Sequence, residues 1–274
     1  MEKIILTAAI TGAETTREKN PALPLTPAEQ AADAAACVAA GAAIIHLHVR
    51  DKEGRPSQDP GDFKRAIEAI RAACRPEPII QLSTGGAAGD SPESRLEPII
   101  RLKPEMASLN VGSMSFGEDV FINHPRDVAE MARHFQQAGV VPEVEVYGPS
   151  HIDIAKTLVK KGLINRPVHY QFVLGVPGGV GGDIRNLVFM RDSIDPRDSW
   201  GVAGIGRFEL PLAVHAMMMG GRIRVGFEDN VYWARGVLAK SNAQLVKRIA
   251  DIAAVAGLKL ASPQEARRML GIAG

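Results

Sequence analysis

The 274-residue sequence has few of the features that mark secreted, membrane-bound or disulfide-rich proteins. It contains only two cysteines, Cys37 and Cys74, each in an alanine-rich segment that reads as helix. Two buried free thiols are therefore expected, rather than a disulfide or a cysteine metal site. No apolar run reaches membrane-spanning length, and the apolar start turns polar by Thr11, too early for a signal peptide. We expect a soluble cytoplasmic protein with no membrane partner.

An excess of charge of either sign is also missing. The sequence has 32 basic and 31 acidic residues, a formal charge of +1, and no basic tract. Nucleic-acid binding normally depends on a concentrated positive surface, so no nucleic-acid partner is expected. With 46% hydrophobic and 23% charged residues, the chain can bury a full-sized core. We expect residues 1–274 to form a single domain.

Short apolar runs recur along the chain, and each is followed by a glycine-rich or polar segment and then a helical one. There are eight of these runs: 4–10, 43–48, 78–83, 106–110, 141–146, 169–174, 200–205 and 222–227. Apolar strands that alternate with helices predict a parallel sheet covered by helices. Eight such units predict an α/β fold of the TIM (β/α)8 barrel type. A doubly wound sheet is the alternative, but polar clusters at nearly every strand end favour a barrel mouth.

Local signals mark several helix ends. Thr26-Pro27-Ala28-Glu29 places a cap, a proline and a capping-box glutamate in order, and Gly41 ends that helix. Ser262-Pro263-Gln264-Glu265 repeats the pattern near the C-terminus. Further helices are expected to begin at Ser91, His124 or Pro125, Ser150 and Ser241.

His46 and His48 stand one residue apart at the end of the second apolar run. Residues i and i+2 of a strand point to the same side, so both rings can reach one metal ion. Two histidines that are merely hydrogen-bonded at a strand end are the alternative without a third ligand. Glu228 ends the eighth run and is a candidate third ligand, because two histidines and a glutamate form a catalytic zinc site with room for substrate.

Other polar residues at the strand ends leave alternatives open. Glu143 and Glu145 share one face of a strand and can either support the histidines or form salt bridges. Glu14 follows the first run, and its position alone favours a solvated loop carboxylate over a ligand-binding residue. The glycine-rich segment 178–182 matches neither familiar phosphate-binding pattern, so a mobile loop is favoured. The five remaining histidines are expected at surface or capping positions: His124, His134, His151, His169 and His215.

Several segments, in order and across essentially the whole chain, resemble one enzyme family. They are 6–15, 45–50, 81–86, 104–110, 171–179 and 226–230. These segments are similar to those of the zinc-dependent β-keto acid cleavage enzymes. The resemblance implies a TIM barrel and a Claisen-type exchange, in which a β-keto acid and acetyl-CoA give acetoacetate and a new acyl-CoA. It also implies a homotetramer.

The resemblance places site residues on this sequence. Zinc would be held by His46, His48 and Glu228, the three residues already suspected. The substrate contacts it implies are Glu14, Ser83, Gly86 and Ser108, and the charged pair on strand eight is Arg224 and Asp229. Ser108 departs from the threonine of the family, keeping the hydroxyl but losing a methyl group, which affects substrate fit rather than the chemistry.

These residue types suit the reaction. Zinc can polarise a carbonyl oxygen, a carboxylate such as Asp229 can move the proton at C2, and Arg224 can orient that carboxylate. Glu14 would pair with a substrate ammonium. The resemblance implies 3-keto-5-aminohexanoate of lysine fermentation as the substrate, with 3-aminobutyryl-CoA as the second product.

Three alternatives stay open on the sequence. The same chemistry could act on a different β-keto acid. A zinc hydrolase of the amidohydrolase type is the second, although it takes its paired histidines from strand one and adds histidines from strands five and six. The third is a non-catalytic barrel that binds a ligand or assembles without turnover, against which the intact set of candidate ligands argues.

Overall fold

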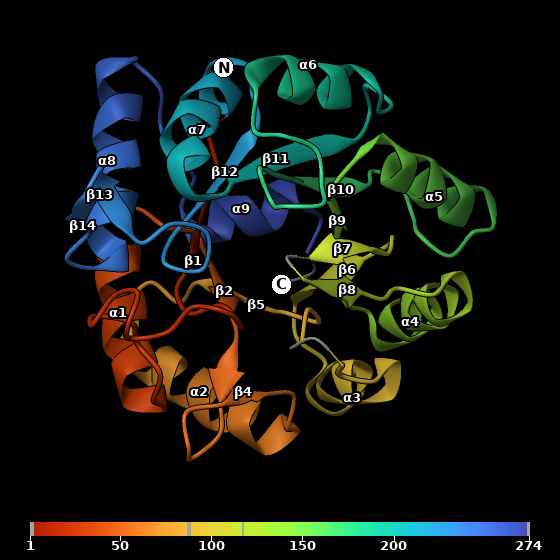
Figure 1. The fold of residues 1–274 in the computed structure, drawn as a ribbon, viewed down its shortest axis with the longest axis horizontal. Coiled ribbons are helices and arrows are strands. Elements are labelled where there is room, and N and C mark those ends of the chain that lie inside the picture. Colours follow the sequence, from red (N-terminus) through yellow and green to blue (C-terminus); the bar gives the residue numbers. More distant parts are fainter. Residues whose placement is uncertain (1–2, 87–88, 117, 273–274) are drawn as a thin grey trace.

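The predicted barrel is confirmed. The computed structural model describes residues 3–86, 89–116 and 118–272, and eight parallel strands close into a ring surrounded by helices (Figure 1). Around the ring the order is β1, β12, β11, β10, β9, β6, β5, β2. The strands are β1 (Leu6–Ala9), β2 (Ile44–Leu47), β5 (Ile79–Leu82), β6 (Met106–Asn110), β9 (Val141–Val146), β10 (His169–Leu174), β11 (Ser199–Gly204) and β12 (Arg222–Val225).

Helices cover the outside of the ring (Figure 1). They are α1 (Pro27–Ala39), α2 (Pro60–Ala73), α3 (Pro92–Leu102), α4 (Pro125–Ala138), α5 (Pro149–Lys160), α6 (Ile184–Asp192), α7 (Glu209–Met218), α8 (Asn242–Val255) and α9 (Pro263–Met269), with a 3-10 turn at Gly206–Phe208. None of them, within the described ranges, is long and apolar enough to cross a membrane.

The helices begin where the capping residues in the sequence predict, with one exception. Thr26 and Ser262 each close a capping box, and the His124 side chain caps α4. The helix expected to begin at Ser150 begins instead at Pro149, with Gly148 as its cap. A proline at the first helical position lacks the N–H that would otherwise be unpaired, so Pro149 outcompetes the serine as a starting residue.

In the described part of the chain, three hairpins interrupt the strand–helix pattern, and they were not expected from the sequence. They are β3 (Val49–Arg50) with β4 (Pro56–Ser57), β7 (Met114–Phe116) with β8 (Asp119–Phe121), and β13 (Tyr232–Ala234) with β14 (Val237–Leu238). Each follows a barrel strand, on the side of the barrel where parallel strands present their carboxyl ends.

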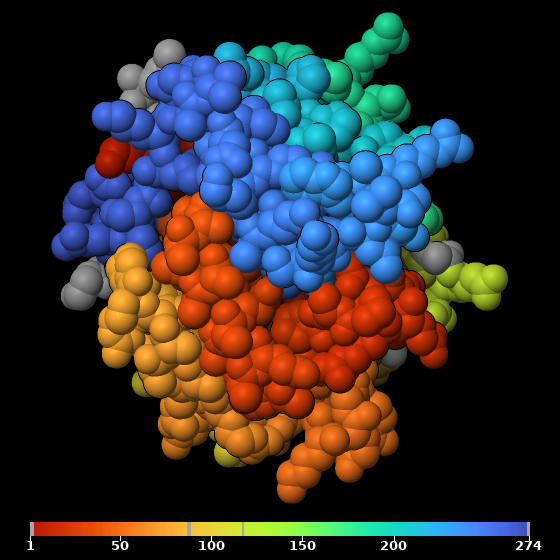
Figure 2. Space-filling view, turned by 90° about the vertical axis from the view of Figure 1, so that its left-hand side faces the viewer, coloured from red at the N-terminus to blue at the C-terminus, as the bar shows by residue number. Residues whose placement is uncertain are grey.

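The two ends of the chain meet in the barrel wall. β1 pairs with β12 through Thr7 and Arg224, and α1 packs beside α8. Figure 2 shows the early segments, in red and orange, directly against the late segments, in blue. At the amino end of the barrel strands, Ile5 and Ile44 belong to an apolar cluster. Helix α9 packs against this cluster and contributes Ala266 to it. The barrel is therefore filled with apolar side chains at its amino end, and its polar interior residues lie above them.

Candidate active site

A cavity of about 530 Å³ opens at the carboxyl end of the strands. Its polar lining comes from segments far apart in the sequence, since Glu14 follows β1, His48 follows β2 and Ser83 follows β5. Apolar side chains form another part of the wall, among them Phe116 and Val176. A mixed cavity at this end of a TIM barrel is where substrates bind and react.

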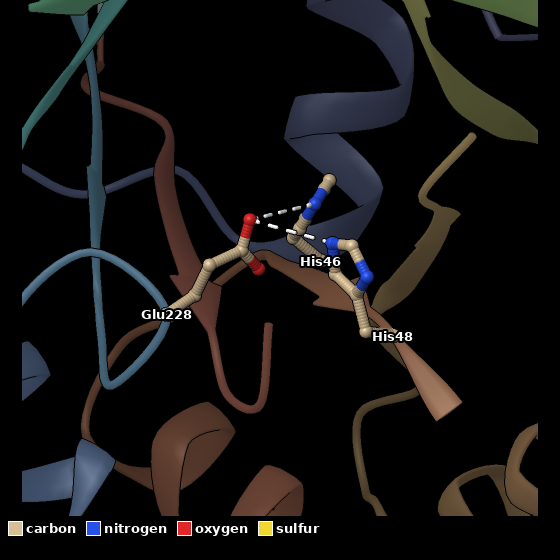
Figure 3. Close-up of side chains that lie close together, drawn as sticks. All are labelled: His46, His48 and Glu228. Atoms are coloured by element: carbon tan, nitrogen blue, oxygen red, sulfur yellow. Dashed lines mark ion pairs between the residues drawn. The ribbon is translucent and has the colours of Figure 1, made fainter. Parts of the chain in front are cut away.

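The structure brings the three predicted metal ligands together (Figure 3), and two of them, His48 and Glu228, line this cavity. His46 Nε2 lies 3.5 Å and His48 Nε2 lies 3.4 Å from Oε1 of Glu228. One potential ligand atom from each residue falls within 4.8 Å of the others. Both rings come from the end of β2, and the carboxylate comes from the turn that follows β12.

The turn after β12 is shaped by a close approach to β1. Gly226 has a φ of +144°, and a Cβ built there would lie 2.3 Å from the carbonyl oxygen of Ala9. That same oxygen accepts a hydrogen bond from the backbone N–H of Glu228. Buried Glu209 accepts from the Gly226 N–H, and burial raises its pKa to about 8. Glycine is required here because any side chain would push the Glu228 turn away from β1.

Two observations show that these residues fit a divalent metal. Among the described residues, the buried atoms His46 Nε2 and Glu228 Oε2 have no hydrogen-bond partner. Unpartnered buried polar atoms are costly, and a bound ion would satisfy both. Two imidazole nitrogens and one carboxylate form a common catalytic zinc shell, with the remaining position left for substrate.

The local charge supports the same conclusion. Arg224 is 4% exposed and contacts three carboxylates. Its Nη1 donates to Glu145 at 2.9 Å, and its Nη2 donates to Glu228 at 2.6 Å. Its Nε and Nη2 also donate to the two oxygens of Asp229, at 2.9 and 2.8 Å. One guanidinium balances only one of three negative charges, so a dication would neutralise the cluster.

Two of these carboxylates, Glu228 and Asp229, differ in the direction of their pKa shifts. Burial raises the pKa of Asp229 to about 6, although Arg224 opposes the shift. Burial also acts to raise the pKa of Glu228, but Arg224 and the two histidines outweigh it and hold that pKa well below its usual range. Asp229 can therefore exchange a proton near neutral pH, which suits a general base.

The four predicted substrate contacts fall into two groups. Glu14, Ser83 and Gly86 line the cavity. Ser108 does not: it is fully buried, and its Oγ accepts a hydrogen bond from the Thr84 N–H, supporting the 83–86 loop from behind. In this geometry Ser108 acts on the loop that faces the cavity.

The sequence left two roles open for Glu143 and Glu145, namely support of the histidines or salt bridges. Their contacts in the structure decide between these roles. Glu145 forms a salt bridge with Arg224. Glu143 pairs with Arg222 and also accepts a hydrogen bond from Gln81, whose own oxygen lies 2.6 Å from Nδ1 of His46. Gln81 was missed from the sequence. It is the one polar residue in an otherwise apolar strand, Ile79–Leu82, and that pattern was the available signal.

Two of the other histidines correct the expectation of surface or capping positions. His169 is buried, with its ring hydrogen-bonded to Ser199 and to the Leu270 carbonyl, because it begins a strand instead of ending one. His151 is also buried, and its Nδ1 accepts from the Tyr147 N–H. Both rings are satisfied without a metal.

Comparison with known proteins agrees with this arrangement. The family described as beta-keto acid cleavage enzyme matches residues 3–272. The chain belongs to the β-keto acid cleavage enzyme family. Two curated relatives, each named 3-keto-5-aminohexanoate cleavage enzyme, are 48% identical over 99% of both chains; they come from Acetoanaerobium sticklandii and Fusobacterium nucleatum.

A more distant relative within the β-keto acid cleavage enzymes carries a different name. The 3-oxoadipate:acetyl-CoA acetyltransferase of Cupriavidus necator is 36% identical over 98% of this chain and 94% of its own. Among solved structures, the apo structure of ObcA superposes with a TM-score of 0.78 at 22% identity, covering 92% of this chain and 66% of that one. The latter likeness supports the fold alone.

A first prediction concerns the metal. His46→Ala, His48→Ala and Glu228→Gln should each remove most bound zinc from the purified protein, because a three-ligand site cannot spare one ligand. Metal content by atomic emission gives the measurement, and His134→Ala on the outer helix α4 is the matched histidine control. Full zinc stoichiometry in any one of the three site variants would show that the residue is not a ligand.

Proposed function

We propose that this chain catalyses the zinc-dependent exchange between 3-keto-5-aminohexanoate and acetyl-CoA, giving acetoacetate and 3-aminobutyryl-CoA. The observation that carries the proposal is the 48% identity to enzymes of that name over 99% of the chain, joined to the grouped candidate metal ligands and a cavity lined by most of the other candidate site residues. His46, His48 and Glu228 would hold the zinc, which supplies Lewis-acid chemistry at the keto group when bound.

The reaction begins with removal of a proton from C2. Asp229 is the candidate base, because it is buried beside Glu228 and its pKa of about 6 leaves it able to accept and return a proton. Arg224 holds both Asp229 oxygens and so fixes the direction of the carboxylate. The resulting carbanion attacks the acetyl carbonyl of acetyl-CoA. CoA then passes to C3, and cleavage of the C2–C3 bond releases both products.

The substrate carboxylate has a suitable place in the 83–86 loop. Ser83 and Gly86 line the cavity, and the Gly85 N–H is held by Ser83 Oγ at 3.1 Å. Because that amide is already used, the hydroxyl hydrogen of Ser83 is the candidate donor to the carboxylate, and the glycines let the ligand come close to the backbone.

Glu14 is the candidate partner of the substrate ammonium. Its loop is anchored by buried Arg50, which donates to the carbonyls of Gly12 and Thr15 on either side of it. Glu14 lines the cavity but remains solvent-exposed. The ion pair would therefore form at a partly hydrated position, which lowers its strength below that of a fully buried pair.

The other functions gain less support. A hydrolase of the amidohydrolase type needs histidines from strands five and six. The fifth and sixth barrel strands carry Glu143, Glu145 and His169, and His169 bonds to Leu270 at the opposite end of the barrel. A non-catalytic barrel gives no reason to bury three carboxylates around one arginine. A different β-keto acid remains the second candidate, because the relative from Cupriavidus necator is named for 3-oxoadipate.

The proposal includes the broader setting of the enzyme. Residues 1–274 would form one catalytic domain that assembles as a homotetramer in the cytoplasm. Both cysteines are free and buried, which suits a reducing compartment.

The second prediction tests the function directly. The zinc-loaded protein with 3-keto-5-aminohexanoate and acetyl-CoA should form acetoacetate and 3-aminobutyryl-CoA in equal amounts, measured by mass spectrometry. His46→Ala should form neither product above background. If 3-oxoadipate or an uncharged β-keto acid is turned over faster than the amino substrate, the chemistry stands but the substrate assignment is wrong.

The third prediction isolates the base. Asp229→Asn should keep zinc but lose most enzyme-dependent exchange of the C2 protons into deuterated water, because an amide cannot accept that proton. NMR of the substrate without acetyl-CoA measures the exchange, and a reaction without protein gives the background. Wild-type exchange in a zinc-loaded Asp229→Asn protein would assign the base to another residue.

The fourth prediction concerns the ammonium. Glu14→Gln should lower kcat/KM for 3-keto-5-aminohexanoate by roughly 5- to 30-fold, about 1–2 kcal/mol, and leave 3-ketohexanoate nearly unaffected. Glu18→Gln, an exposed carboxylate in the same loop, is the control. Equal losses for the two substrates would mean that Glu14 supports the site in general and does not recognise the ammonium.

A further inference from the structure

A line of buried hydrogen bonds runs from His46 through the barrel interior, away from the cavity. His46 Nδ1 lies 2.6 Å from Oε1 of Gln81, and Gln81 Nε2 donates to Glu143 at 2.9 Å. The other oxygen of Glu143 accepts from Arg222 Nη2 at 3.1 Å. These side chains range from 0% to 7% exposed, so water does not substitute for these contacts.

The barrel register creates this line. His46 on β2 and Gln81 on β5 are direct neighbours across paired strands, so both side chains point inward at the same level. Glu143 reaches Gln81 from β9 and Arg222 reaches Glu143 from β12. Four strands thus contribute one residue each.

The chemistry of the line gives it a direction. A carboxylate paired with an arginine can only accept hydrogen bonds, so Gln81 must turn its NH2 group toward Glu143. The amide oxygen of Gln81 then faces His46 and can only accept. In its neutral form, the form that binds a metal, His46 must therefore carry its proton on Nδ1, which leaves a free lone pair on Nε2, the atom that lies toward Glu228.

We propose that Gln81, Glu143 and Arg222 are positioning residues that fix the tautomer of His46 as a metal ligand before the metal arrives. The inference rests on the metal centre of the proposed function. It assigns roles to three residues that touch neither substrate nor metal. The opposite orientation of Gln81 would set its oxygen against the Glu143 carboxylate and its NH2 group against His46, which would favour the proton on Nε2.

His48 provides an internal contrast. Its ring lines the cavity and lies 3.4 Å from Glu228, yet within the described part of the chain no other side chain holds its second ring nitrogen. One imidazole of the pair is therefore set in advance, and the other can adjust as a ligand enters.

The fifth prediction measures zinc affinity by competition with a chelator. Gln81→Met fills a similar space without a hydrogen bond and should weaken zinc binding by about 10- to 100-fold. Gln171→Met is the matched control, because Gln171 is also a buried glutamine of the barrel interior, on β10, and its Nε2 has no hydrogen-bond partner among the described residues. Unchanged affinity in Gln81→Met, or an equal loss in both variants, would overturn the proposal.

An exchange of the residue types at positions 81 and 143 tests the direction of the hydrogen bonds from His46 to Glu143. Gln81→Glu alone keeps an acceptor for His46 but removes the donor to Glu143 and places two carboxylates side by side, which should weaken zinc binding. In the double variant Gln81→Glu with Glu143→Gln, the amide at position 143 donates to the carboxylate at position 81, so the hydrogen bonds of the line are complete again. The double variant should recover affinity to within about threefold of wild type. No recovery relative to Gln81→Glu would contradict the assigned direction.

The tautomer itself can be read without any variant that might misfold. In metal-free wild-type protein labelled with 15N-histidine, at a pH at which the His46 ring is neutral, His46, assigned by its loss in His46→Ala, should show a protonated Nδ1 and an unprotonated Nε2. The reverse pattern would refute the proposal by itself. Because none of these measurements uses turnover, a protein that passes them but does not cleave the keto acid would fail the proposed function alone.

Discussion

The arrangement of Arg224 among three carboxylates constrains the whole upper part of the barrel. Glu145, Glu228 and Asp229 come from β9 and from the turn after β12, and each has an oxygen within 2.9 Å of the guanidinium. Buried charges are tolerated only when they are paired and hydrogen-bonded. The strands that carry these residues must therefore keep their register, and an excess of negative charge remains beside the two histidines.

A second pairing, lower in the barrel, separates the metal region from the apolar layer below. Arg222 balances Glu143 and donates to the Ser199 hydroxyl, which in turn contacts His169. The interior therefore changes from apolar at α9 to polar at the cavity through two levels of ion pairs. This order explains why so many charged side chains can point inward without destabilising a barrel that is otherwise packed with aliphatic residues.

The fold was accessible from the sequence because its signals are local. Strand runs, caps such as Thr26 and the paired histidines each depend on residues close together in the chain. Gln81 was not recognised because its role depends on the register between β2 and β5, which no local pattern encodes. Ser108 shows a related limit. The sequence predicts a substrate contact, but the backbone of Thr84 bonds to the Ser108 hydroxyl, and the side chain is buried. The burial of a side chain depends on tertiary packing, which the local sequence does not specify.

The seam between β1 and β12 has a consequence for how the protein is made. The three candidate ligands are residues 46, 48 and 228, which lie at or just after the carboxyl ends of β2 and β12, the two strands that flank β1. A growing chain cannot assemble this set until β12 has left the ribosome and closed the ring. A metal bound there would contact both sides of the seam and would favour the closed barrel over any opened form by its own binding free energy. Metal uptake would then depend on closure of the ring.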